Sequence, residues 1–133
     1  MTGTDSAQQH GGGLTVAISD AVVQLLHEYT GRGPTKARTT IDRDAIFVVL
    51  RDTMTKAERR LHEQGDGDLV LETRRRFQAG MRTDLVAAIE HLTARTVMAF
   101  MSTNHLDPDL ACEVFVLEPE GRGLESIPVR ASP

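Results

Sequence analysis

The feature that most constrains the fold is residues 28–40, where a helical pattern of apolar residues stops and an alternating pattern begins. Spacings of four, three, one and three place the apolar residues before this point on one helix face: Ile18, Val22, Leu25, Leu26 and Tyr29. Gly31 is the predicted C-cap, because glycine takes the left-handed conformation that ends many helices. Gly33 and Pro34 then stop helical geometry, since proline lacks an N–H donor and restricts the preceding residue. We therefore expect the chain to pass directly from a helix into a strand.

The same loop carries the cations Arg32, Lys36 and Arg38. They follow a predicted helix C-terminus, where unpaired carbonyls and the helix dipole favour positive charge. A phosphate-binding glycine loop instead presents N–H groups at a helix N-terminus, so the position of this loop argues against one. Two interpretations stay open: a plain helix-to-strand connector with cationic capping, or an anion or partner site that uses Arg32 and Arg38.

Two strands and two further helices are predicted next. Residues 36–41 and 45–51 alternate or run apolar, which predicts a hairpin with a three-residue loop, Asp42 to Asp44. The spacing of Thr55 and Glu58 predicts a capping box and a short helix to about residue 64. The longest helix is expected from an N-cap at Asp68 to about residue 93. Its predicted buried stripe is Phe77, Met81, Leu85, Ala88, Ile89 and Leu92.

Residues 96–102 and 110–117 predict a second hairpin, which completes an α+β fold. The expected order is helix, hairpin, helix, helix, hairpin, with a four-stranded, mainly antiparallel sheet and the helices packed on one face. The other face is then expected to be apolar and uncovered, and a homodimer is the simplest way to cover it. Residues expected there are Ile46, Val48, Met98 and Phe100.

The chain is expected to hold one domain, residues 14–117, between two flexible tails. Residues 1–13 lack an apolar pattern that would offset the entropy of ordering them, and residues 118–133 are polar and rich in glycine and proline. The single cysteine, Cys112, lies in a strand pattern and is expected to be buried and inert.

Composition excludes several function classes. The formal net charge of -4 gives the chain no overall attraction to nucleic acid. No run approaches 18 uninterrupted apolar residues, so we expect a cytoplasmic protein without direct membrane insertion.

No catalytic residue, metal site or cofactor is predicted. The compact group His105, Asp107 and Asp109 lies in a sequence typical of a turn. Arg74, Arg75 and Arg76 point about 100° apart on a helix, which favours a solvated face with local pairs over a single anion cluster.

The segment Glu-Tyr-Thr-Gly-Arg-Gly-Pro at residues 28–34, followed by Lys36-Ala37-Arg38-Thr39, resembles the most characteristic segment of the MpsC-like family. The resemblance continues through the first hairpin and residues 55–61 to the last hairpin, over about residues 16–117. It implies a small soluble accessory component of a Na+-translocating, membrane-potential-generating system linked to bicarbonate supply. It marks these positions as a binding motif without an assigned role: Tyr29, Gly31, Arg32, Gly33, Pro34 and Arg38.

Two functional hypotheses follow. The first is a non-enzymatic accessory or regulatory domain, a homodimer that binds a protein partner such as the subunits of a membrane cation or bicarbonate transporter. The second is a sensor of a small anion or phosphorylated metabolite. The sensor would use the Gly-Arg-Gly-Pro loop together with Arg38 and the arginines at 74–76.

Overall fold

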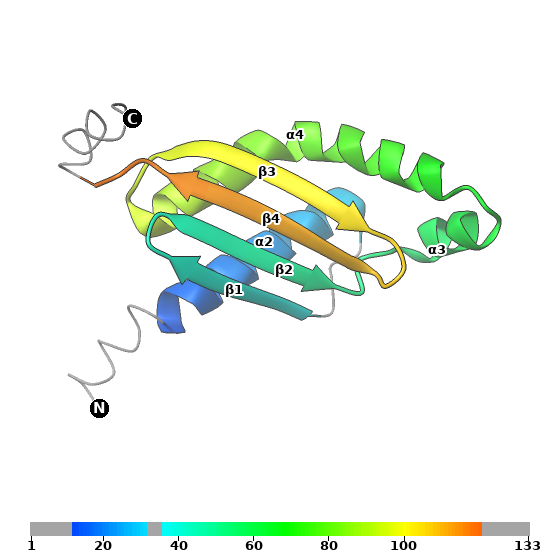
Figure 1. Ribbon diagram of the computed structural model, residues 1–133, viewed down its shortest axis with the longest axis horizontal. Helices are drawn as coiled ribbons and strands as arrows, with labels where there is room; N and C mark the ends of the chain where they lie inside the picture. The colour runs from blue at the N-terminus through cyan, green and yellow to red at the C-terminus, as the bar shows by residue number, and fades with distance from the viewer. Residues whose placement is uncertain (1–11, 32–35, 121–133) are drawn as a thin grey trace, which may run out of the picture.

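The computed structural model describes residues 12–31 and 36–120. Within them the elements follow in the order α2 (Leu14–Thr30), β1 (Lys36–Asp42), β2 (Ala45–Arg51), α3 (Lys56–Glu63), α4 (Gly67–Thr93), β3 (Val97–His105) and β4 (Leu110–Leu117) (Figure 1). The strands form one antiparallel sheet in the order β1-β2-β4-β3. The predicted α+β class with a four-stranded antiparallel sheet is confirmed. Most of the two predicted tails, residues 1–11 and 121–133, lies outside the described residues.

Local signals set the helix ends. α2 ends at Gly31, whose φ of 79° is left-handed and whose N–H donates to the His27 carbonyl at 2.8 Å. The capping box of α3 is confirmed, because Thr55 and Glu58 each accept the other's backbone N–H. α4 begins one residue before the predicted N-cap Asp68, which lies instead in the first turn. A carboxylate is favourable there because of the helix dipole.

The first hairpin is tighter than the sequence predicts. Asp42 still belongs to β1 and pairs with Ala45, so the turn has two residues rather than three. Arg43, its first residue, has a φ of 58°. Two-residue hairpin turns require a positive φ, which is common for glycine and asparagine and unusual for arginine. The sequence therefore indicated a turn at this position but not its two-residue length.

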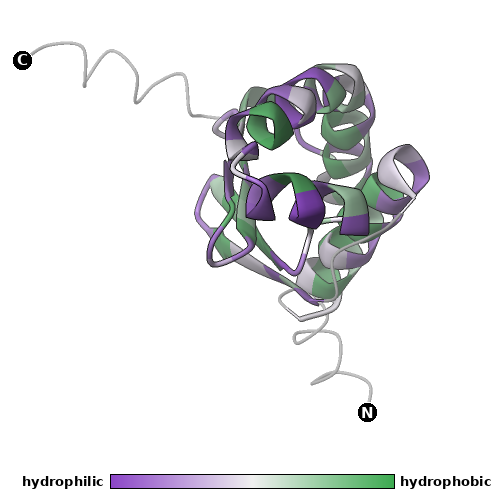
Figure 2. Ribbon diagram, turned by 90° about the vertical axis from the view of Figure 1, so that its right-hand side faces the viewer, coloured by the Kyte–Doolittle hydropathy of each residue, from purple (hydrophilic) through white to green (hydrophobic). Residues whose placement is uncertain are grey.

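The core lies between the sheet and the two long helices. In Figure 1, α2 and α4 lie behind the sheet, on one of its faces, whereas α3 lies beyond its end. α2 packs against β1 and α4, and α4 also packs against β3 and α3. The end-on view shows hydrophobic and hydrophilic segments on the same helices (Figure 2), as expected for elements with one buried face. The core cluster is Ile18, Val22, Ile46, Val48, Leu50, Met81, Leu85, Ile89, Phe100, Ala111, Phe115 and Leu117.

The prediction for the uncovered sheet face was wrong for three of its four residues. Ile46, Val48 and Phe100 are buried and belong to the core, and only Met98 is exposed. Met98 and Phe100 are two residues apart, so in a regular strand they would face the same side of the sheet. The register, however, shifts between Val97 and Ala99. A bulge adds one residue to a strand, so the side chains on its two sides change face.

The predicted stripe of α4 holds in its second half. Met81, Leu85 and Ile89 are buried, but Phe77 is 42% exposed. The first half of α4 lies beside the short helix α3 and also reaches β3, where Arg74 donates to Asn104. A partly open space adjoins Phe77.

Candidate functional site

The described residues of the predicted motif lie on different sides of the molecule. The Tyr29 hydroxyl donates to Asp84 Oδ2 at 2.8 Å, which joins the end of α2 to α4, and this hydrogen bond raises the pKa of Tyr29. Gly31 caps α2. Arg38 is exposed on β1, on the sheet face away from the helices. Arg32, Gly33 and Pro34 lie outside the described residues, so their role stays a prediction.

The side chains of the three consecutive arginines of α4 point in different directions. Arg75 and Arg76 are exposed and pair with Glu72 one turn away, as the local-pair interpretation predicted. Arg74 points the other way, into the protein, with a side chain only 12% exposed. The helix lies behind the sheet, so Arg74 and Arg38 lie on opposite sides of it. These two arginines therefore do not share one anion site.

Arg74 is the centre of a polar network that joins four segments. Its Nε and Nη2 donate to the two carboxylate oxygens of Glu58 at 2.9 and 2.8 Å. Its Nη1 donates to Thr53 Oγ1 at 2.8 Å and to Asn104 Oδ1 at 2.9 Å. Burial alone would raise the pKa of Glu58, but the hydrogen bonds from Arg74 hold it below its usual value. The network thus fixes the start of α3 against α4 and β3.

Asp109 extends this network from the loop between β3 and β4. Its Oδ1 accepts from Thr53 Oγ1 at 2.7 Å and its Oδ2 accepts from the Met54 N–H at 2.9 Å. Burial opposes the charge, but these hydrogen bonds lower the pKa of Asp109. His105 Nδ1 lies 2.8 Å from the Pro108 carbonyl oxygen. Within residues 12–31 and 36–120, no group of three or more His, Cys, Asp or Glu side chains is placed to hold a metal ion.

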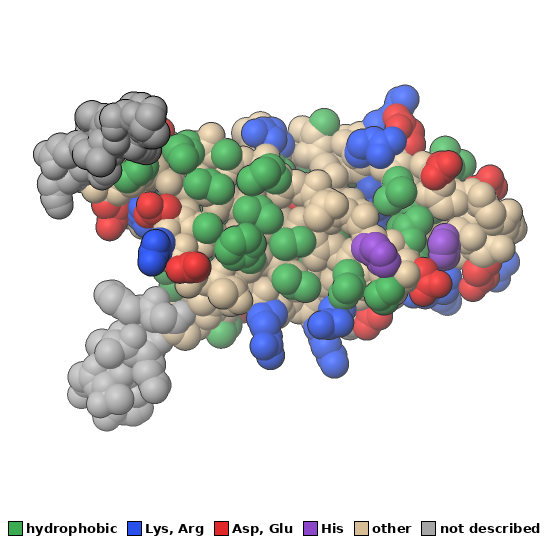
Figure 3. Space-filling model, in the orientation of Figure 1, with side chains coloured by type: hydrophobic (Ala, Val, Ile, Leu, Met, Phe, Trp, Pro, Cys, Tyr) green, Lys and Arg blue, Asp and Glu red, His purple; other side chains and the backbone are tan. Residues whose placement is uncertain are grey.

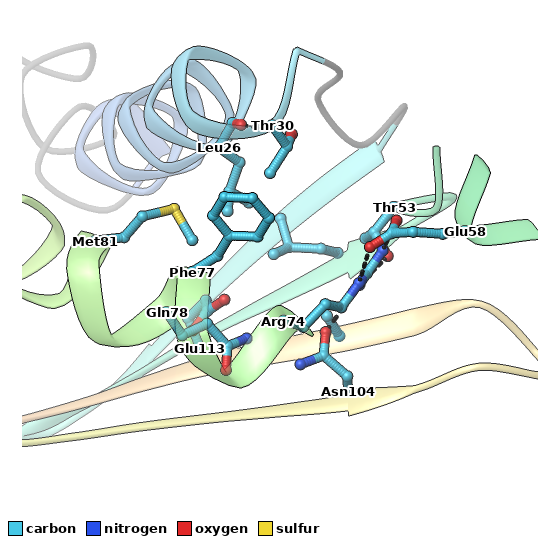
Figure 4. Close-up of a pocket in the computed structure, with 12 residues that line it drawn as sticks. Leu26, Thr30, Thr53, Glu58, Arg74, Phe77, Gln78, Met81, Asn104 and Glu113 are labelled. Atoms are coloured by element: carbon cyan, nitrogen blue, oxygen red, sulfur yellow. Dashed lines mark hydrogen bonds and ion pairs between the residues drawn. The ribbon is translucent and has the colours of Figure 1, made fainter. Parts of the chain in front are cut away.

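A small cavity adjoins Arg74, between the helices and the sheet (Figure 4). Leu26 of α2 and Phe77 and Met81 of α4 supply apolar walls, and Arg74 and Glu113 supply polar ones. Its volume is about 40 Å³. A buried water needs on the order of 10–15 Å³ measured in this way, so the space suits a few water molecules. It is much smaller than the several hundred Å³ of a typical metabolite pocket.

Glu113 is the least expected residue of this cavity. It lies on the central strand β4, is 1% exposed, and faces the helices with Ala111 and Phe115. Its Oε1 and the Oγ of Ser102, its neighbour on β3, are buried without a hydrogen-bond partner among the described residues. Burial raises the pKa of Glu113, although the positive charge of Arg74 favours the charged form.

Sequence reasoning missed both of these buried charges. Glu113 occupies an inward position of the β4 alternation, and a charged residue in an apolar row was the available signal. The pair of Arg74 with Glu58 spans 16 positions. Nothing local in the sequence indicates that contact.

The face of the sheet away from the helices is apolar and uncovered in the described structure. Figure 3 views this face, and hydrophobic side chains gather over β2, β4 and β3. Phe47, Met98 and Met101 are exposed large hydrophobic residues. We call the outward-pointing side chains of β2, β3 and β4 the outer sheet face: Phe47, Val49, Met98, Met101, Leu110, Cys112, Val114 and Val116.

The outer sheet face also carries the single cysteine. Cys112 is partly buried rather than in the core, between Val49 and Thr103 of the neighbouring strands. Burial raises the pKa of its thiol, and the charge of Glu113 adds to this effect. The thiol is therefore protonated at neutral pH and is a weak nucleophile, in agreement with its predicted inertness.

In the described part of the chain, α2, α3 and α4 all fall short of the length and apolar character that a bilayer-spanning helix needs. Searches of curated proteins and of solved structures found no match. A family model does match: its description is "Na+-translocating membrane potential-generating system (MpsC)", and the match covers residues 10–119. These residues include every described element of the fold. The chain therefore belongs to the MpsC family.

Proposed function

We propose that this protein is a non-enzymatic accessory or regulatory component of a Na+-translocating membrane system, and that it works from the cytoplasmic side by binding protein. The family description supplies the system. The observation that carries the mode of action is the outer sheet face, where Phe47 of β2 and Met98 and Met101 of β3 are exposed and the apolar Val114 and Val116 of β4 lie between these two strands. Contiguous apolar surfaces of this kind are typical of protein-binding sites.

The polar network around Arg74 supports a structural rather than a catalytic role for the buried charges. Every nitrogen of the Arg74 guanidinium donates to a protein oxygen of Glu58, Thr53 or Asn104. Such a network holds elements in place and leaves little capacity for a substrate. The proposal therefore assigns no chemical step to it.

The alternative of an anion or metabolite sensor has less support. It needs Arg38 and the α4 arginines to converge, but Arg38 and Arg74 lie on opposite sides of the sheet. Arg74 is already paired with Glu58, and Arg75 and Arg76 with Glu72. An anion would have to compete with these carboxylates.

The proposed function is tested by purifying the tagged full-length protein from its own host under conditions that preserve membrane complexes. Three forms are compared: the native protein, Met101→Glu and Leu69→Glu. Met101 and Leu69 are matched, at 53% and 52% exposed, but Leu69 lies on α4, away from the outer sheet face. Each change adds one charge at an exposed apolar position, so both variants should fold.

We expect integral-membrane subunits of a cation-translocating system to copurify with the native protein and with Leu69→Glu, and to be lost with Met101→Glu. Their absence from the native preparation would contradict the accessory role. Their retention by Met101→Glu would show that the outer sheet face is not the binding surface.

A further inference from the structure

We infer that the outer sheet face binds a second copy of this chain, arranged so that each strand lies over its own counterpart running in the opposite direction. The inference rests on the proposed protein-binding role of this face and names a second occupant, which binds reversibly and so exchanges with a membrane subunit on the same face. It comes from the distribution of charge at the two ends of the sheet.

The middle of the face is apolar across the strands. In the register of the sheet, Phe47 lies beside Val114 and Val114 beside Met101. The next row holds Val49 and Cys112. Sheets that pack face to face bury rows of this kind in a layer about 10 Å thick.

The outward-pointing residues at the two ends of β1 and β2 differ in charge. At one end Lys36 of β1 pairs in register with Arg51 of β2, and Arg38 follows on the same side of β1. At the other end of β1 the outward residue is Asp42. Its outward direction is fixed by alternation, because the intervening Thr39 points inward and its Oγ1 lies 2.7 Å from Ser19 Oγ of α2. None of Lys36, Arg38 and Asp42 makes an ion pair within the part of the chain that the structure describes.

This charge distribution selects between two symmetric ways to stack the faces. A twofold axis parallel to the strands places β1 over β3 of the second copy, so that Lys36 and Asp42 face β3 rather than each other, and the outward β3 residues Ala99, Met101 and Thr103 carry no charge. A twofold axis in the interface and perpendicular to the strands places β1 over β1 of the second copy with its direction reversed. Lys36 of each copy then faces Asp42 of the other, and symmetry repeats the contact. The second arrangement is therefore favoured.

The size of the face fits a reversible dimer. Four strands about 4.8 Å apart and about eight residues long cover roughly 500 Å² in projection on each copy. The two copies together then bury roughly 1,000 Å² or somewhat more, which is near the lower limit for specific interfaces. The dimer is expected to dissociate on dilution rather than to be permanent.

The test is the mass of the full-length protein by sedimentation over a concentration series, for the native protein and four variants. Lys36→Asp and Asp42→Lys each place like charges opposite one another twice in the proposed dimer. The double variant Lys36→Asp with Asp42→Lys restores both attractions with the signs exchanged. Glu63→Lys is the control, because Glu63 is an exposed acid on α3, which lies beyond the end of the sheet. Circular dichroism establishes that each variant is folded.

We expect the native protein and Glu63→Lys to approach twice the monomer mass of 14.6 kDa. Each single reversal should raise the dimer dissociation constant about tenfold or more, and the double variant should recover most of that loss. Three results would overturn the inference: a native protein that is monomeric throughout, single reversals without effect, or a double variant that stays as weak as the single ones.

The sedimentation result and the copurification test of the proposed function can fail independently. A monomeric native protein that still loses its membrane subunits on Met101→Glu would leave the outer sheet face as a surface for those subunits and remove the second copy. A dimer that follows the charge pattern, but that copurifies with no membrane subunit, would keep this inference and remove the accessory role.

Discussion

At the scale of single residues, Arg74 and Glu113 are two buried charges with different consequences. Arg74 is paired in full with Glu58, Thr53 and Asn104. Glu113 has an oxygen without a partner, and burial raises its pKa. The Arg74 charge stabilises the fold only while its partners remain, whereas burial disfavours the charged form of Glu113.

Arg74→Ala is expected to lower the free energy of unfolding by about 3 kcal/mol, because it leaves Glu58 as a poorly solvated charge without its partner. Arg75→Ala is the matched control: Arg75 is the next residue, is 65% exposed, and pairs only at the surface with Glu72. We expect that variant to change stability by about 0.5 kcal/mol or less. Urea unfolding measures both. Equal losses in the two variants would contradict the assigned role of Arg74.

Glu113→Gln tests the raised pKa of Glu113. Below the ordinary glutamate value of 4.5 the carboxyl group is protonated in both the folded and the unfolded chain. As pH rises, the unfolded chain releases this proton before the folded chain does, so the free energy of unfolding of the native protein falls through the raised pKa. The variant lacks this loss. It should therefore be more stable than the native protein at pH 7, by a margin that shrinks toward pH 4.5.

Glu58→Gln should change the free energy of unfolding at pH 7 in the opposite direction, and the same pH series of unfolding experiments measures it. The pKa of Glu58 is lowered, so its contribution to stability is present above the ordinary value and is lost as pH falls. This variant should be less stable than the native protein at pH 7, with a deficit that shrinks in acid. A Glu113→Gln margin that is constant or grows in acid would show that burial does not raise the pKa of Glu113.

At the scale of elements, glycine has opposite effects at the end and in the middle of a helix. Gly31 ends α2 with a φ of 79°, which a residue with a Cβ adopts at a cost. Gly80 lies inside α4, and a Cβ added there meets nothing within 4 Å. Gly31→Ala should lower the free energy of unfolding, measured by urea unfolding, by about 1 kcal/mol. Gly80→Ala should raise it by up to about 1 kcal/mol. A gain from Gly31→Ala would contradict the left-handed cap.

The same elements show what local sequence signals can and cannot predict. The cap at Gly31 and the capping box of Thr55 with Glu58 depend on neighbouring residues, and both were predicted correctly. The pairing of β2 with β4 joins two hairpins across both α3 and α4, so no local pattern indicates it. Phe100 was predicted on the wrong side together with Ile46 and Val48, because β2 and the start of β3 are apolar on both faces. The bulge in β3 is why Met98 faces outward while Phe100 faces the core.

At the scale of the whole molecule, the sheet has one covered and one uncovered face. α2 and α4 lie on one side, and the core cluster fills the space between them and the sheet. The outer sheet face keeps an apolar centre in solvent (Figure 3). The candidate site could be predicted from the sequence only in part: an uncovered face followed from the element order, but its residues depended on strand register.

The most direct test of the account is methyl NMR of the full-length protein labelled at its methionine methyl groups and recorded over a dilution series. Met98 and Met101 lie on the outer sheet face, whereas Met54 and Met81 are 3% and 2% exposed and serve as internal controls. We predict that the signals of Met98 and Met101 shift as the dimer dissociates while those of Met54 and Met81 stay in place. Signals of Met98 and Met101 that do not move at any concentration would contradict the account, because the outer sheet face would then have no second copy to cover it.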